Sequence, residues 1–170
     1  MLLEAIQLDE FLIRPLSHNE DLRTYLKWMR DPERYPFIKS TRTNYSESEL
    51  VAYIKRVNSS VSAIQYGIFS KPSMEHIGNI KFHDINFEEK SCFVGFLIAD
   101  QRYQNRGLAG LVFNHCAKQL MEKFQIVRFY LSVERQHLQA IRAYTKIGFK
   151  PENQERGSTS DSTFTLVLQL

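Results

Sequence analysis

The sequence predicts an α/β fold in which a mixed, mostly antiparallel sheet of about seven strands is flanked by four helices. Short apolar or alternating runs are interleaved with segments whose apolar residues recur every three to four positions. In addition, three strand-like runs follow one another through short polar turns, which is the pattern of an antiparallel meander. No repeat, low-complexity tract or linker interrupts the 170 residues. We therefore expect a single domain over residues 1–170.

The first strand and the first helix lie near the N-terminus. The run "FLIRPL" at residues 11–16 is typical of a strand. Ser17 and Glu20 then have the spacing of a capping box, in which each side chain bonds the other residue's backbone N–H. We expect a helix over about residues 19–31, ended by Pro32, because the residue before a proline is steered away from helical geometry.

A second helix and a meander of three strands follow. Ser46 and Glu49 repeat the capping-box spacing, and apolar residues from Leu50 to Val57 recur with helical spacing. Beyond "NSS" the pattern changes to continuous or alternating apolar runs, separated by "KPSME" and "NFEEK". The three predicted strands are residues 63–70, 76–85 and 91–99.

The second half alternates helices with strands. Apolar residues from Leu108 to Phe124 predict a long amphipathic helix packed on the sheet. A second helix, over residues 138–147, is expected to end at Gly148 in the left-handed conformation. The strands of this half are expected at residues 126–133, from Phe149 onward, and at residues 162–170. The polar hairpin "PENQERGSTSD" separates the last two strands.

Composition excludes several classes of function. With 22 basic and 19 acidic residues the chain has a formal net charge of +3, too small for a non-specific nucleic-acid binder. Cys92 and Cys116 stand alone in apolar stretches, so we expect buried free thiols and neither a disulfide framework nor a metal site. The pattern of a signal peptide and a long apolar run are both absent. We expect a cytoplasmic protein with no nucleic-acid or membrane partner.

The segment "QNRGLAG" at residues 104–110 holds two of the seven glycines. It opens the long helix, so its backbone N–H groups lie where an anion such as phosphate is favoured. Gly107 and Gly110 would let the backbone approach the anion, and Arg102 or Arg106 would add positive charge. The P-loop and dinucleotide-binding motifs are absent. From this segment alone, an anion site and an ordinary tight turn both remain open.

A second motif lies downstream of this segment. The pattern Q-x-x-G-x-A at Gln104, Gly107 and Ala109 is followed by "AIRAYTKIGFK" at residues 140–150. With these two motifs, and with the same order of elements over essentially the whole chain, the sequence resembles the GNAT family of N-acetyltransferases. The pieces "FLIRPL", "LKWMRDP" and "IGNIKFHDI" further resemble its branch of ribosomal-protein N-terminal acetyltransferases. The resemblance implies the GNAT fold and an acyltransferase that uses acetyl-coenzyme A (acetyl-CoA) and no metal.

The resemblance also implies where the cofactor binds. In the family the glycine segment holds the pyrophosphate of acetyl-CoA on backbone amides, and pantetheine lies between two splayed strands, here residues 93–99 and 128–133. The backbone amides of the first strand's end would contact pantetheine and stabilise the oxyanion. The implied cofactor-binding residues are Leu97, Ile98, Ala99, Gln104, Asn105, Arg106, Gly107, Leu108, Ala109, Gly110, His137 and Tyr144.

Tyr144 is the implied catalytic residue. The family places a tyrosine here near the thioester sulfur, and a phenol of pKa about 10 can protonate a thiolate whose reference pKa is about 8.5. His137 replaces the asparagine of most members; it could contact the cofactor arm, act as a base, or be a surface residue at a helix start. The family's usual glutamate is absent from the strand before the glycine segment. Candidate bases are Glu134, His83 and Asp84, or water alone.

The acceptor is expected at residues 31–47, because the first two helices and their connection usually select the substrate in this fold. This segment contains Tyr35, Phe37, Tyr45, Arg34, Lys39 and Arg42. Such a mixture suits a primary amine that carries phosphate or carboxylate, such as an amino sugar or a nucleotide-linked amino sugar. A polyamine would need an acidic pocket, and solvated surface charge remains the other interpretation.

Two other functions stay open. They are a protein N-terminal acetyltransferase of the ribosomal-protein type and a non-catalytic CoA-binding domain. Tyr144 argues against the second of these, whereas the missing glutamate and the altered His137 argue for it. We expect a monomer or a homodimer.

Overall fold

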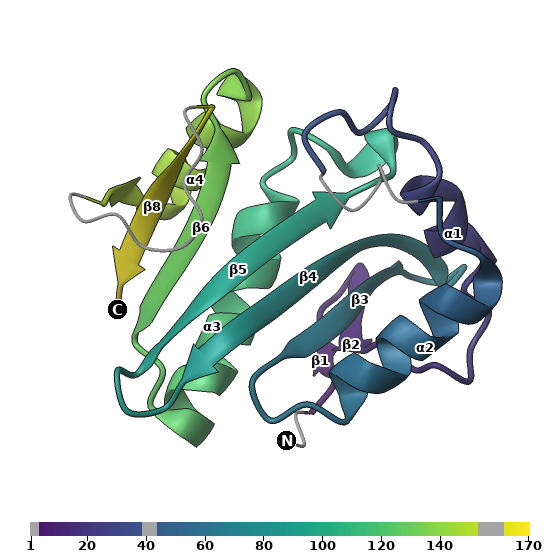
Figure 1. Cartoon of the computed structure of the whole chain (residues 1–170), viewed down its shortest axis with the longest axis horizontal. Coiled ribbons are helices and arrows are strands. Elements are labelled where there is room, and N and C mark those ends of the chain that lie inside the picture. The colour runs from purple at the N-terminus through teal and green to yellow at the C-terminus, as the bar shows by residue number, and fades with distance from the viewer. Residues whose placement is uncertain (1–3, 39–43, 153–161) are drawn as a thin grey trace.

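The computed structural model describes residues 4–38, 44–152 and 162–170. In this part of the chain one eight-stranded sheet carries helices on both faces (Figure 1). The helices are α1 (Arg23–Met29), α2 (Glu47–Asn58), the 3-10 helix η2 (Gln101–Tyr103), α3 (Leu108–Phe124) and α4 (Leu138–Ile147). The strands are β1 (Ile6–Gln7), β2 (Phe11–Pro15), β3 (Ile64–Ser70), β4 (Glu75–Asn86), β5 (Ser91–Ile98), β6 (Arg128–Glu134), β7 (Lys150–Pro151) and β8 (Thr163–Gln169).

The fold class predicted from the sequence is confirmed. The strands run in the order β1-β2-β3-β4-β5-β6-β8-β7 across the sheet, and every neighbouring pair is antiparallel except β5 and β6. The strand that the prediction missed is β1, two residues that pair with β2 through Ile6 and Ile13. A strand of two residues is too short to give a periodic signal.

β5 and β6 diverge along their length. They pair as parallel strands only where Ser91–Phe93 lies opposite Arg128–Tyr130. Beyond that point β5 continues to Ile98 and β6 to Glu134 without pairing with each other, and Figure 1 shows the two strands separating. We refer to this diverging part as the β5–β6 splay. It leaves the backbone of β5 unpaired on its β6 side.

Two apolar cores lie against the sheet. The larger core packs α3 against the strands, with the ring of Phe129 5.2 Å from that of Phe113 and 6.1 Å from that of Phe82. The smaller core joins α1 and α2 to the other side of the sheet around Leu50 and Phe69. The sheet is thus covered by α1 and α2 on one face and by α3 on the other (Figure 1).

The first helix is shorter than predicted at both ends, and its predicted capping box does not form. The Glu20 carboxylate accepts the backbone N–H of Ser17, but it is also held by the Arg14 guanidinium at 2.5 Å. The Ser17 hydroxyl accepts the N–H of Asn19 and closes a turn. α1 begins only afterwards, at Arg23. The ion pair to β2 is the physical reason, because it holds Glu20 in this turn.

The other predicted helix ends are confirmed. At the start of α2 the Ser46 hydroxyl accepts the Glu49 N–H at 3.2 Å, and the Glu49 carboxylate accepts the Ser46 N–H at 2.7 Å. Gly107 precedes α3 with a φ of 78°, and Gly148 ends α4 with a φ of 113°. Both angles lie in the left-handed region, which glycine adopts without strain.

Candidate active site

The glycine segment forms an open turn before α3. Asn105 and Gly107 are left-handed, with φ of 59° and 78°. No side chain caps the N-terminus of α3, so the N–H groups of residues 107–110 have no acceptor within the helix. A Cβ placed on Gly107 would meet no atom within 4 Å. The turn therefore presents open N–H donors at the positive end of a helix dipole, where an anion is stabilised.

Two side chains of the segment anchor the turn. The Gln104 side-chain amide donates to the carbonyl oxygen of Ile98 at 2.7 Å, which fixes the turn to the end of β5. The Gln139 side-chain amide donates to the Asn105 side-chain oxygen at 2.8 Å, which fixes the turn to α4. These polar groups hold the backbone in place, and the N–H groups that follow remain open.

The remaining residues of the segment face different surroundings. Leu108 is buried in the larger core, and Ala109 is half-buried. A Cβ on Gly110 would lie 3.2 Å from Cγ1 of Ile147, so the glycine lets α3 and α4 approach each other. Arg106 is exposed, and its guanidinium donates to a backbone carbonyl of η2 at 3.3 Å.

One backbone amide at the end of β5 faces the splay. The N–H groups of Ala99 and Asp100 both donate to the carbonyl oxygen of Ile77, at 2.9 and 3.2 Å, which is the pattern of a β-bulge. Backbone groups alternate sides along a strand, so Leu97 faces β4 like Ala99, and Ile98 faces the opposite side. Of the three predicted amides, only that of Ile98 points toward the β5–β6 splay.

Tyr144 lies beside the splay. Its ring centroid is 5.8 Å from that of Phe96 on β5 and 6.1 Å from that of Phe149. Burial raises the pKa of Tyr144 to about 12. Within the part of the chain that the structure describes, no partner accepts or donates a hydrogen bond at its hydroxyl. A protonated hydroxyl with a free hydrogen therefore lies next to β5.

The loop after α1 bridges the ends of β5 and β6. The Tyr35 hydroxyl donates to the carbonyl oxygen of Ala99 at 3.1 Å, at the end of β5. The Phe37 ring stacks on the ring of His137, with centroids 4.3 Å apart and planes 18° apart, just after β6. Burial lowers the pKa of His137, so its imidazole favours the neutral form. This loop closes one side of the splay.

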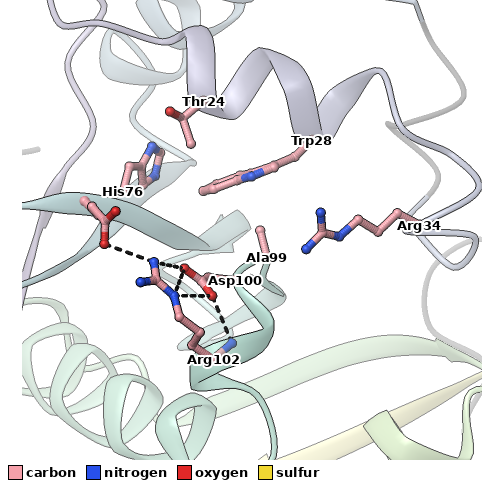
Figure 2. A pocket seen from close by; sticks show the side chains of 8 residues that line it. Thr24, Trp28, Arg34, His76, Ala99, Asp100 and Arg102 are labelled. Carbon is pink, nitrogen blue, oxygen red and sulfur yellow. Dashed lines mark hydrogen bonds and ion pairs between the residues drawn. The ribbon is translucent and has the colours of Figure 1, made fainter.

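A cavity of about 310 Å³ opens beside α1 at the end of β5 (Figure 2). Side chains from α1, the loop after it, the start of β4 and the turn after β5 surround it. The lining residues are Thr24, Trp28, Arg34, Glu75, His76, Ala99, Asp100 and Arg102. Ala99 directly follows Ile98, whose N–H faces the splay. The cavity and the splay therefore meet at the end of β5.

The two carboxylates and two arginines that line this cavity are paired unequally. Arg102 pairs with both carboxylates, at 2.6 Å from Asp100 and 3.0 Å from Glu75 (Figure 2). The hydrogen bond from Arg102 holds the pKa of the Asp100 carboxyl below its usual range. The Arg34 guanidinium lies 5.6 Å from the ring of Tyr35 and has no ion pair with the described residues. Arg34 is the cation of the cavity that no carboxylate holds.

Several predicted residues lie apart from this cavity. His83 and Asp84 bond each other at 2.9 Å near the far end of β4, where they line a second cavity of about 310 Å³. Glu134 ends β6, across the splay from the end of β5. Lys39 and Arg42 lie outside the described residues.

Sequence reasoning missed six residues that line the cavity. They are Thr24, Trp28, Glu75, His76, Asp100 and Arg102, of which Arg102 was predicted only as a positive charge beside the glycine segment. A weak signal existed for His76, because it alternates with the buried Ile77 on the predicted strand and so faces the opposite side of the sheet. Trp28 lies in the first predicted helix and is the only tryptophan of the chain. No periodicity shows that these positions meet in space.

A comparison with protein families identifies the family of this chain. The family model described as "Acetyltransferase (GNAT) domain" matches residues 10–150. The chain belongs to the GNAT family. This confirms the resemblance predicted from the glycine segment and from the motif around Tyr144. The protein is an N-acetyltransferase enzyme of this family and uses acetyl-CoA.

Solved structures of other GNAT enzymes have the same fold. A spermidine N-acetyltransferase from Vibrio cholerae, in complex with CoA and spermine, is 17% identical with a TM-score of 0.78, over 95% of this chain and 96% of that one. A ribosomal-protein-S5-alanine acetyltransferase from Vibrio fischeri is 12% identical with a TM-score of 0.79, over 98% and 96% of the two chains. No curated protein sequence matches this chain. At these identities the likeness shows the fold alone.

Other sequence predictions concern metals, thiols and membranes. Among residues 4–38, 44–152 and 162–170, no three His, Cys, Asp or Glu side chains are grouped so as to hold a metal ion. Cys92 and Cys116 are buried free thiols, as predicted. No described helix is long and apolar enough to cross a membrane.

Proposed function

We propose that this GNAT enzyme transfers the acetyl group of acetyl-CoA to the primary amine of a small molecule, such as an amino sugar or a nucleotide-linked amino sugar. One observation carries the proposal: the β5–β6 splay meets the glycine turn and Tyr144 on one side and the cavity with Arg34 on the other. An acetyl donor in the splay and an amine in the cavity would therefore meet at the end of β5.

The cofactor fits the residues that surround the splay. The open N–H groups of residues 107–110 suit a pyrophosphate, because they combine unpaired donors with the helix dipole. The Ile98 N–H suits a contact with pantetheine or with the oxyanion that develops on the acetyl carbonyl. Gln104 and Asn105 hold the turn, and His137 shapes the bridge at the end of β6. Bound acetyl-CoA supplies an activated thioester.

Tyr144 is proposed as the general acid that protonates the departing thiolate. A pKa of about 12 keeps its hydroxyl protonated at neutral pH. The reference pKa of a thiol is about 8.5, so proton transfer from the phenol to a fully formed thiolate is uphill. The free hydroxyl hydrogen compensates for this, because its donation stabilises negative charge on sulfur as that charge develops.

The charge of the cavity favours an acceptor that carries an anionic group. Both carboxylates are already paired with Arg102, so little net negative charge remains to attract a polycation. Arg34 is available to a phosphate or carboxylate, which guanidinium groups bind in bidentate fashion. The Trp28 ring provides a flat apolar wall for a sugar or a base.

Thiol release from acetyl-CoA with a panel of amines tests this proposal. The panel contains a phosphorylated amino sugar, a nucleotide-linked amino sugar, spermidine and peptides with the N-termini of ribosomal proteins. We expect the two anionic amino sugars to give the highest kcat/KM. A clear preference for peptides would establish the protein N-terminal acetyltransferase instead. Tight CoA binding without thiol release for any amine would indicate a non-catalytic CoA-binding domain.

A further inference from the structure

His76 packs against two aromatic rings at the edge of the cavity. Its ring lies 4.8 Å from that of Phe69, with planes 23° apart, and 4.8 Å from that of Trp28. The Arg14 guanidinium lies over the Phe69 ring, 4.2 Å from its centroid. Close packing against neighbouring rings restricts a side chain to one rotamer. The imidazole is therefore fixed in orientation before any substrate binds.

Hydrogen bonds fix the tautomer of this histidine. Nε2 of His76 lies 3.0 Å from the Gly78 carbonyl oxygen and 2.9 Å from the Asn79 side-chain oxygen. A backbone carbonyl only accepts hydrogen bonds, so Nε2 carries the proton and Nδ1 carries the lone pair. Nδ1 has no hydrogen-bond partner among the described residues, and it is not one of the atoms sealed from solvent without a partner. A histidine in this state is ready to accept a proton at Nδ1.

The position of His76 places its imidazole at the edge of the cavity. His76 lines the cavity together with Ala99 (Figure 2). Its neighbour Ile77 accepts the N–H groups of Ala99 and Asp100, so the start of β4 is bonded directly to the end of β5. The imidazole thus lies on the strand that borders the point where the cavity meets the splay.

The carboxylates of the cavity are poorer proton acceptors. Asp100 and Glu75 both receive hydrogen bonds from Arg102, and the pKa of the Asp100 carboxyl is held below its usual range. A carboxylate that accepts hydrogen bonds from a guanidinium takes a proton from an amine less readily than a neutral imidazole with a free lone pair does. Among the described side chains that line this cavity, His76 alone has such a lone pair.

We propose that His76 is the general base of the reaction and takes a proton from the acceptor amine at Nδ1. This role rests on the proposed function, because it requires an amine in the cavity. It also supplies a base in place of the glutamate that the sequence lacks before the glycine segment. The group acts on the acceptor directly or through one water molecule.

The proton balance of the step is complete. Nδ1 takes one proton from the ammonium form of the acceptor, and the free amine forms a C–N bond to the acetyl carbon. The C–S bond breaks, and the thiolate takes the proton of the Tyr144 hydroxyl. The second proton lost by the amine nitrogen returns to Tyr144 through water, and Nδ1 releases its proton to solvent. The products are the amide, the free thiol and one proton.

Burial keeps His76 neutral near pH 7. It lowers the pKa of His76 below the usual 6.5, and the hydrogen bonds that Nε2 donates to Asn79 and Gly78, together with the charge of Glu20, counter part of this effect. Arg14 acts in the same direction as burial but is paired with Glu20. The charged and titratable groups that face His76 from the packed elements are Arg14, Glu20, Tyr25, Glu75, Asp100 and Arg102.

The variant His76→Gln tests the proposal. Glutamine keeps an N–H donor for the Gly78 carbonyl but has no proton-accepting nitrogen. With the panel amine that the wild type acetylates fastest, we expect kcat at about pH 7 to fall about 100-fold, with the KM of acetyl-CoA unchanged. The decrease of wild-type kcat on the acidic side of pH 6.5 should disappear in the variant. The ratio of wild-type kcat to variant kcat should decrease as the pH rises, because the amine is then already deprotonated in water.

Controls separate this role from a structural one. The variant His115→Gln removes an exposed histidine of α3 and should behave as wild type. Nitrogen-15 spectra of the wild-type imidazoles, with the His76 signals assigned by their loss in the variant, should show protonated Nε2 and unprotonated Nδ1 at about pH 7. An Nδ1–H tautomer, or a variant with wild-type kcat and an unchanged pH profile, would overturn the base role. If the wild type releases no thiol with any amine, the proposed function fails, and the base role fails with it.

Discussion

Individual side chains set the charge of the acceptor cavity. Arg102 is bonded to both carboxylates that line it, and Arg34 remains without an ion pair among the described residues. The cavity is lined by two acidic residues and two arginines, and these numbers alone predict no preference for an anionic or a cationic ligand. The pairing decides the preference, because a paired carboxylate attracts a cation much less than a free one does.

Replacement of Arg34 tests its role in acceptor binding. We expect Arg34→Gln to raise the KM of a phosphorylated amino sugar about 10- to 100-fold, because a charge-assisted hydrogen bond contributes about 1.5–3 kcal/mol. The KM of acetyl-CoA should not change. Steady-state kinetics with phosphorylated and neutral amino sugars provide the measurement, and Arg56→Gln, an exposed position on α2, is the control. An equal loss with the neutral sugar would contradict binding of the anion.

Replacement of Tyr144 tests proton donation to the thiolate. We expect Tyr144→Phe to lower kcat about 100-fold, because the ring still packs against Phe96 while the acidic proton is lost. CoA binding, measured by calorimetry, should stay close to that of the wild type. Since the pKa of Tyr144 is about 12, kcat of the wild type should show no loss from this group between about pH 8 and pH 10. Unchanged turnover of the variant would exclude the acid role.

At the scale of elements, two similar sequence signals have different outcomes. Ser46 and Glu49 form the capping box of α2, whereas Ser17 and Glu20 close a turn before α1. The spacing is the same in both cases. The difference comes from Arg14, which lies on β2 and draws the Glu20 carboxylate into an ion pair. A capping box is therefore a reliable signal only when no distant cation competes for its acid.

The turn into α3 depends on the conformation of one glycine. Gly107 has a φ of 78°, in the left-handed region, whereas Gly95 on β5 lies outside that region. At both positions an added Cβ would meet no atom within 4 Å, so the two glycines differ in backbone conformation and not in space. We expect Gly107→Ala to lower the free energy of unfolding by about 1–2 kcal/mol through backbone strain. Gly95→Ala, the matched control, should leave it nearly unchanged. Chemical denaturation measures both.

The same pair of variants reports on the cofactor. A shifted turn misplaces the open N–H groups, so Gly107→Ala should also raise the KM of acetyl-CoA several-fold, by about 1 kcal/mol of lost binding. Gly95→Ala should keep the wild-type value. Equal KM values for the two variants would indicate that the turn does not bind the cofactor.

At the scale of the whole molecule, two half-buried histidines make the free energy of unfolding depend on pH. Burial lowers the pKa values of His76 and His137 below the usual 6.5. As the pH falls below 6.5, the unfolded chain binds protons that these residues do not bind in the folded chain, so the free energy of unfolding falls. The pKa values of Asp21 and Asp100 are lowered from the usual 3.8, so these carboxylates reduce the free energy of unfolding only as the pH falls near and below 3.8.

Urea unfolding at two pH values tests this linkage. We expect a lower midpoint at about pH 5.5 than at about pH 7.5, and a smaller difference in His76→Gln than in the wild type. His115→Gln, which removes an exposed histidine, should keep the wild-type difference. Equal midpoints of the wild type at the two pH values would contradict the lowered pKa values.

The sequence by itself determined the class of elements, most of their boundaries, the left-handed Gly148 and the GNAT family. These features depend on side chains within a few positions of one another, so periodicity and motif spacing record them. The glycine turn and Tyr144 were predicted as parts of one site. In the structure Gln104 bonds the turn to the end of β5, and Tyr144 lies next to Phe96 on β5.

Only the tertiary structure decided the start of α1, the face of each β5 amide and the charge of the cavity. Each depends on a partner in another element: Arg14 on β2, Ile77 on β4, and Glu75 on β4, which Arg102 reaches from the turn after β5. Such pairs form when the sheet brings separate strands together, and no local pattern specifies them. The proposed acceptor cavity is therefore a property of the folded chain, whereas the turn proposed to bind the cofactor can be predicted from a single segment.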